Sequence, residues 1–94
     1  MNKNMKKKHN KAAVALKYVE GVDKVPRVAA KGEGKIAEAI LAIAKEHDIP
    51  VREDPDLIEL LYPLELEEEI PPKLYGVVAE LLAYIYRING KMKE

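Results

Sequence analysis

Cysteine, serine, threonine, glutamine, phenylalanine and tryptophan are absent from this chain. Without cysteine there is neither a disulfide framework nor a thiolate nucleophile, and without serine or threonine the hydroxyl nucleophiles are missing too. No apolar stretch approaches the ~20 residues that a membrane-spanning helix needs, and the basic start lacks the apolar segment of a signal peptide. These absences favour a cytoplasmic protein that is not an enzyme and has no cofactor.

Charge is unevenly placed, although the formal net charge is zero. Five lysines lie within residues 1–11, so the rest of the chain has 16 acidic residues against 11 basic ones. We expect residues 1–11 to be a disordered tail, because blocks of like charge repel and do not pack. The acidic body argues against nucleic-acid binding. The tail could still approach an anionic membrane, at ~1 kcal/mol for each lysine.

Two short apolar runs predict strands. The first spans Ala12–Val19, and the second spans Val25–Lys31 with Pro26 at its start or on an edge. Ile49 to Arg52 is long enough only for a small strand or an extended link, and Leu64 to Glu69 for a connector or a very short strand.

Helical spacing predicts three helices. The first runs from Glu33 to His47, with an apolar face made of Ile36, Ala37, Ile40, Leu41, Ile43 and Ala44. A second starts at Asp54-Pro55-Asp56, has Leu57, Leu60 and Leu61 on its buried face, and stops near Tyr62.

The third helix opens at Ile70-Pro71-Pro72 and ends at Asn89-Gly90, residues that tolerate a left-handed cap. Its buried stripe is Leu74, Val77, Val78, Leu81, Leu82, Ile85 and Ile88. The expected fold class is α/β: a small sheet of three to four short strands flanked by three helices, in a single compact domain at 12–90 with a charged tail at 91–94.

Three candidate sites have a plain structural explanation. Lys31 to Lys35 (KGEGK) lies between a strand and a helix, as phosphate loops do, but Ile36 follows where a P-loop needs a hydroxyl, so we interpret it as a turn. His9 and His47 lack metal-ligand spacing. The acidic run Glu65, Glu67, Glu68 and Glu69 lacks the spacing of a hard-cation loop, which favours a solvated acidic face over a cation site or a contact with a basic partner. No metal site is expected.

Five blocks, in order, resemble the cytoplasmic domain of the FlhB/YscU family of flagellar and type III secretion export-gate proteins. They cover the chain from about Ala13 to Ile88. The blocks are AVALKY from Ala13, PRVAAKG from Pro26, IAKEH from Ile43 with Ile49-Pro50, EDPDLIELLY from Glu53, and Ile70-Pro71 with Leu74-Tyr75 and VAELLAYIY up to Tyr86.

The resemblance implies a role in recognising export substrates or in switching substrate specificity. Partners would be export substrates or a hook-length-control protein, together with membrane proteins of the export apparatus, and we expect a monomer at the inner face of the membrane near the gate. The alternative is a structural or regulatory paralogue that binds proteins without a direct export role.

The family carries Asn-Pro-Thr-His before the strand that corresponds to AVALKY, and it cleaves itself between Asn and Pro through a succinimide. In register, this chain has Lys8-His9-Asn10-Lys11, and it contains no Asn-Pro pair. We therefore expect no self-cleavage. In the family a strand precedes this turn, and here that strand would be missing or replaced, which leaves one edge of the sheet open. A partner's strand could pair with that edge, or the lysines could protect it against aggregation. We favour protection by the lysines.

For substrate contact, the resemblance points to a shallow apolar patch at Val25, Pro26, Ala79 and Leu82. Leu82 fits the core stripe of the last helix equally well. Val25 and Pro26 follow a turn and are the better candidates for exposure.

Overall fold

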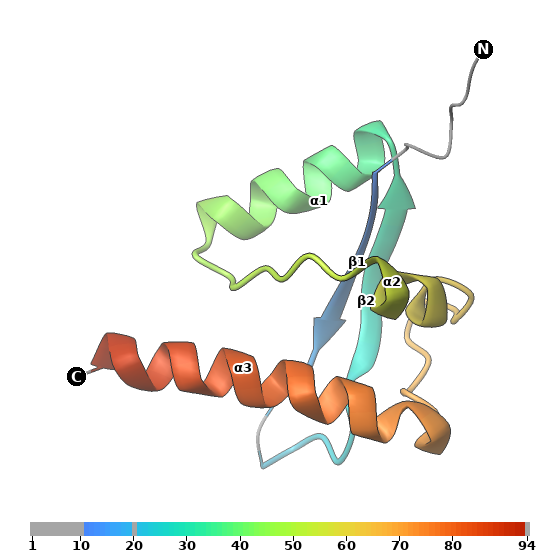
Figure 1. Cartoon of the computed structure of the whole chain (residues 1–94). Helices are drawn as coiled ribbons and strands as arrows, with labels where there is room; N and C mark the ends of the chain where they lie inside the picture. Colours follow the sequence, from blue (N-terminus) through green and yellow to red (C-terminus); the bar gives the residue numbers. More distant parts are fainter. Residues whose placement is uncertain (1–10, 20, 94) are drawn as a thin grey trace.

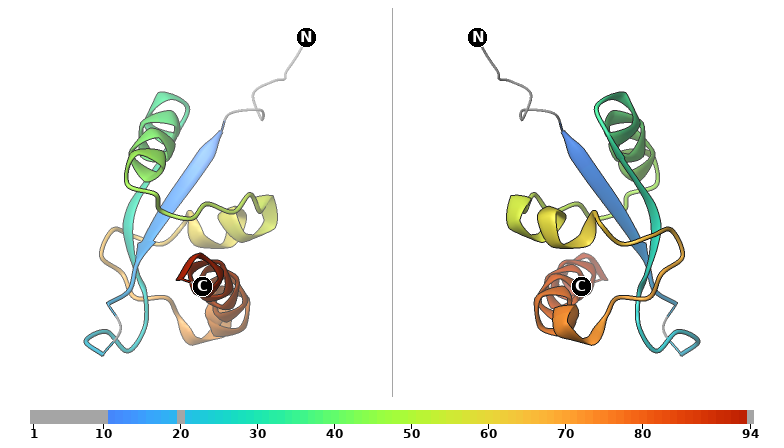
Figure 2. Two further views of the ribbon diagram at one scale, coloured as in Figure 1. Left: turned by 90° about the vertical axis from the view of Figure 1, so that its left-hand side faces the viewer. Right: turned by 90° about the vertical axis from the view of Figure 1, so that its right-hand side faces the viewer.

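The fold is a two-stranded sheet between helices. The computed structural model describes residues 11–19 and 21–93, with side chains described up to Arg87. Its elements are β1 (Ala12–Lys17), β2 (Arg27–Glu33), α1 (Lys35–Glu46), α2 (Pro55–Leu61), the 3-10 turn η2 (Pro72–Leu74) and α3 (Tyr75–Lys93). α1 lies on one side of the strands, and α2 and α3 lie on the other (Figures 1 and 2). The α/β class and the three helices are confirmed.

The expectation of three to four strands is wrong, since only β1 and β2 form a sheet among the described residues. Ile49 to Arg52 is an extended link, where Pro50 has no N–H to offer a ladder. The connector before η2 comes closer to a strand. Its residues Glu67 to Ile70 run antiparallel to the start of β2 and form one isolated bridge, Arg27 to Glu69.

Three backbone hydrogen bonds hold this connector against β2. The N–H of Val28 donates to the Glu68 carbonyl at 3.0 Å, and the Val28 carbonyl accepts from the N–H of Glu67 at 2.7 Å. The Pro26 carbonyl accepts from the N–H of Ile70 at 3.0 Å. The start of β2 is therefore bonded on both edges, to β1 on one side and to the connector on the other.

The two faces of the sheet carry different side chains, as strand alternation requires. Ala13 is buried on the side of α1, together with Ala37 and Ala44 of that helix. These small side chains let α1 approach the strands closely. On the other face the larger residues form the main core: Leu57, Leu61, Ile70, Leu74 and Val78, with Val14, Leu16, Leu64, Leu81 and Leu82 packed against them.

Two of the predicted helix boundaries are wrong. β2 runs on through Glu33, and α1 begins only at Lys35, because Gly34 turns the chain with φ of 60°. At the other end of the chain, α3 continues through Asn89-Gly90 to Lys93. Asn and Gly tolerate a left-handed cap but do not impose one.

The start of α2 is confirmed. Asp54 is its N-cap, and the carboxylate accepts a hydrogen bond from the N–H of Leu57 at 3.1 Å. Pro55 opens the helix and Tyr62 is its C-cap.

The predicted buried faces are too wide. Ile36 and Ile43 of α1 are 60% and 55% exposed, Leu60 of α2 is 46% exposed and Val77 of α3 is 40% exposed. A sheet of two strands covers only the sector of α1 around Ala37 and Ala44. Ile36 and Ile43 each stand one position before these alanines, so their side chains point ~100° away around the helix and lie outside the contact between α1 and the sheet.

Gly32 allows the close approach of β2 and α1, since a Cβ built there would lie 2.0 Å from Cγ2 of Ile36. Only Glu33 and Gly34 separate this residue from the helix.

We predict that Gly32→Ala lowers the free energy of unfolding by ~2 kcal/mol, because the backbone or Ile36 must move. Urea denaturation measures the change. The matched control is Gly76→Ala, exposed in α3 with nothing within 4 Å of a new Cβ, where the substitution raises stability by up to ~1 kcal/mol. Equal effects at the two positions would contradict this explanation.

Lys31 links β2 to the end of α2. Its ammonium donates to the carbonyls of Tyr62 at 2.8 Å and Leu64 at 2.6 Å, and it lies 5.1 Å from the centre of the Tyr62 ring. These carbonyls follow the last turn of α2, where the helix dipole favours a cation.

Replacing Lys31 by methionine keeps the aliphatic stem and removes the charged donor. We predict a loss of ~1–3 kcal/mol in the free energy of unfolding, because two carbonyls lose a charged partner. Thermal denaturation would detect this. Lys24→Met, in the exposed loop before β2, is the control and should change the melting temperature little. A Lys31→Met variant as stable as the parent would show that the Lys31 contacts contribute nothing to the free energy of unfolding.

Candidate functional site

The expected contact patch consists of Val25, Pro26, Ala79 and Leu82, and we call it the Pro26 patch. The expectation that Val25 and Pro26 are better candidates for exposure than Leu82 is wrong, since Pro26 is buried and Val25 is half-buried, as Leu82 is. The cause is the connector: the Pro26 carbonyl bonds to the N–H of Ile70, which covers the start of β2.

The two α3 members of the Pro26 patch differ in exposure. Ala79 is exposed, whereas Leu82 is half-buried and packs against the main core. Residues three apart on a helix are surface neighbours, so Ala79 and Leu82 belong to one face. Ile70 connects the two halves of the patch, because it bonds to Pro26 and belongs to the core on which Leu82 packs.

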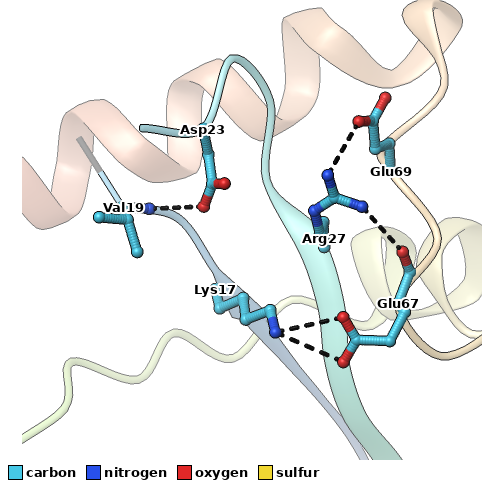
Figure 3. Close-up of polar contacts among 6 residues, drawn as sticks. All are labelled: Lys17, Val19, Asp23, Arg27, Glu67 and Glu69. Carbon is cyan, nitrogen blue, oxygen red and sulfur yellow. Dashed lines mark hydrogen bonds and ion pairs between the residues drawn. The ribbon is translucent and has the colours of Figure 1, made fainter. Parts of the chain in front are cut away.

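Sequence reasoning missed the apolar loop between the strands. Tyr18, Val19 and Val22 are 43%, 53% and 76% exposed there, directly before the Pro26 patch. The Asp23 carboxylate accepts a hydrogen bond from the N–H of Val19 at 2.8 Å and closes the loop (Figure 3). The available signal was the presence of valines in a turn, where polar residues are usual.

The acidic run is largely used within the chain. Figure 3 shows Lys17 beside Glu67, at 3.2 Å, and Arg27 beside Glu69, also at 3.2 Å. The Glu68 carboxylate accepts from the N–H of Glu65 at 2.8 Å. These exposed contacts are each worth little, ~0–1 kcal/mol. Their effect is to match the acidic connector to the basic ends of β1 and β2.

Other candidates for chemistry keep their structural explanation. KGEGK spans the end of β2, the turn at Gly34 and the first residue of α1. His47 is the exposed C-cap of α1, while His9 lies outside the described residues. In the part of the chain that the structure describes, no three histidine, cysteine or acidic side chains converge as metal ligands.

The helices in the described part of the chain are too short or too polar to cross a bilayer.

Comparison with known proteins places the chain in a family. Residues 10–85 match the model of the FlhB HrpN YscU SpaS family. The chain is 43% identical over 81 residues to the uncharacterized protein YlqH of Bacillus subtilis, covering 86% of this chain and 87% of that one. It is 50% identical over 74 residues to the flagellar biosynthetic protein FlhB of Aquifex aeolicus, covering 78% of this chain but 21% of that protein.

Solved structures agree with this match. A mutated EscU/SpaS C-terminal domain superposes with a TM-score of 0.76 at 30% identity, covering 81% of this chain and 95% of that one. The PscU C-terminal domain gives a TM-score of 0.71 at 30% identity, covering 78% and 94%. The chain therefore belongs to the FlhB/YscU family and corresponds to its C-terminal domain. It spans about one fifth of the length of the FlhB proteins it matches, but most of the short YlqH.

Proposed function

We propose that this chain is a non-catalytic binding domain of the flagellar or type III protein export apparatus. Its role is to contribute to export-substrate recognition or to substrate-specificity switching, in the cytoplasm beside the export gate. The observation that carries the proposal is the match to the family over residues 10–85, joined to the fold of the EscU/SpaS C-terminal domain.

The surface supports a binding role. The exposed apolar side chains of the loop between β1 and β2 precede Val25 and Pro26 in the chain, and Ala79 is exposed on α3. Exposed apolar side chains that cluster on a small domain are typical of protein interaction sites. Export substrates, or a hook-length-control protein, are the proposed ligands of this surface, and membrane proteins of the apparatus are the proposed neighbours.

Ala79→Glu tests the patch. A carboxylate placed on an apolar contact must be desolvated when a partner binds. We predict about tenfold weaker binding, which is ~1.4 kcal/mol, to an early export substrate or a hook-length-control protein from the same organism. Isothermal titration calorimetry measures the affinity.

The matched control is Ala42→Glu, an exposed position on α1 across the sheet. Both variants should keep the melting temperature of the parent, and only Ala79→Glu should lose affinity. If the parent binds none of these proteins, and deletion of its gene changes neither motility nor secretion, the paralogue without an export role is the better explanation. If Ala79→Glu binds as tightly as the parent, the proposed function stands, but the Pro26 patch is not the contact site.

We also propose that the chain does not cleave itself. Succinimide formation requires an asparagine whose side-chain amide attacks its own carbonyl carbon, and the family releases a proline at that bond. The aligned positions Lys8 and His9 supply neither residue. Intact-mass measurement after long incubation at neutral pH should return the full 94-residue chain. Fragments split between Lys8 and Lys11 would contradict the proposal.

A further inference from the structure

A groove runs between α3 and the link that leads from α1 to α2. The link, residues 47–54, passes beside the second half of α3 on its way to α2 (Figures 1 and 2). A cleft of about 500 Å³ opens between them, and its lining residues are Arg52 of the link with Glu80, Ala83, Tyr84 and Arg87 of α3. We call the whole groove the Arg52 groove.

A smaller cleft of about 180 Å³ continues the Arg52 groove toward α2, since it shares Arg52 and Glu80 with the first. Two of its lining side chains are apolar and partly exposed, Leu60 at 46% and Val77 at 40%. Val77 and Arg87 are ten positions apart on α3, so the groove is about 15 Å long. That length matches about four or five extended residues.

Arg52 is held in a way that leaves the rim of its guanidinium open. Its Cζ lies 5.5 Å from the centre of the Tyr84 ring, and its side chain is 37% exposed. Its distance to Asp54, 3.9 Å, is too long for a hydrogen bond, and the other oxygen of that carboxylate accepts from the N–H of Leu57. Because the ring covers one face of the guanidinium, the N–H groups at its rim stay available to a ligand.

Arg87 brings a second guanidinium to the same cleft. It is exposed, and among the described residues no carboxylate lies within ion-pair distance of it. The third arginine of the chain, Arg27, is already paired with Glu69 at 3.2 Å. Two arginines at one cleft suit a carboxylate, because the N–H groups of a guanidinium match the two carboxylate oxygens.

We propose that the Arg52 groove binds an extended acidic segment of another protein. One carboxylate of the segment accepts hydrogen bonds from Arg52 and Arg87, and an apolar side chain at its other end covers Leu60 and Val77. Asp54 and Asp56 line the α2 end of the groove, so they repel a carboxylate there and direct it to the arginines.

The Arg52 groove is separate from the Pro26 patch. Val77, Glu80, Tyr84 and Arg87 follow one another at spacings of three and four, which gives them one face of α3, whereas Ala79 and Leu82 belong to another face. The inference therefore does not depend on the proposed substrate contact.

Other occupants fit the Arg52 groove less well. A basic segment would set its charge beside two arginines. The acidic run of a second copy is already used within that copy, where Glu67 pairs with Lys17 and Glu69 pairs with Arg27. An enclosed small molecule is a poor fit, because Glu80, Ala83 and Arg87 on the wall of the groove are exposed.

Peptide titration of the full chain, followed by NMR, tests the proposal. The probe is the peptide Leu-Ala-Asn-Glu-Asp, acetylated and amidated so that only its side-chain carboxylates are charged. We expect the amide resonances of Ala83 and Tyr84 to shift and to saturate at millimolar peptide. A control peptide with Gln-Asn in place of Glu-Asp should bind at least tenfold more weakly. Equal binding of the two peptides, or no saturable shift with either, would overturn the proposal.

Protein variants locate the contact. Arg52→Gln and Arg87→Gln should each weaken binding of the acidic peptide about tenfold, because each removes a charged donor. Arg87 is exposed, so its variant still tests the groove if Arg52→Gln lowers the melting temperature. The matched control, Lys45→Gln, removes one positive charge from an exposed position on α1 and should bind as the parent does.

Three results would contradict the acidic ligand. If Lys45→Gln weakens binding as much as Arg87→Gln, the attraction is a general effect of net charge. If a peptide with two lysines in place of Glu-Asp shifts the same resonances and binds more tightly, the groove prefers a basic segment. If the resonances of Ala83 and Tyr84 move with protein concentration when no peptide is present, a second copy occupies the groove.

Discussion

Val28 directs both of its backbone groups away from β1, and the two hydrogen bonds that they make with Glu67 and Glu68 organise the second half of the chain. They fix the connector along β2, bring Glu67 and Glu69 to Lys17 and Arg27, and set Ile70 into the core. Glu67 itself has φ of 68°, an unfavourable conformation outside glycine that its bond to Val28 helps to maintain. Since η2 and α3 follow directly, the direction of the long helix depends on this attachment.

Much of this arrangement could be predicted from local signals. Asp54-Pro55 marks the start of α2, and the spacing of Leu74, Val78 and Leu82 identifies the inner face of η2 and α3. What could not be predicted depends on the width of the sheet. The helical periodicity of α1 does not reveal that two strands bury only Ala37 and Ala44, leaving Ile36 and Ile43 exposed. Likewise, a proline after a turn suggests exposure, and only the contact with Ile70 explains why Pro26 is buried.

A family resemblance supplied the residues of the Pro26 patch, and their role as a contact site stays a prediction. Those residues fall where α3 and the start of β2 share a core, with Ala79 outermost. The residues that composition could not reveal are Tyr18, Val19 and Val22, which are apolar yet exposed. Exposed apolar side chains of this kind are typical of protein interaction sites.

The central structural claim is that the start of β2 is bonded on both edges, whereas β1 is bonded on one edge among the residues that the structure describes. Amide hydrogen exchange of the free protein, followed by NMR, tests it residue by residue. The amides of Ala13, Ala15 and Val28 should be strongly protected, whereas those of Ala12, Val14 and Leu16 should exchange at least tenfold faster, because unpaired edge amides remain open to water. Uniform protection along β1, or a Val28 amide that exchanges as fast as Val14, would contradict the arrangement described for this sheet.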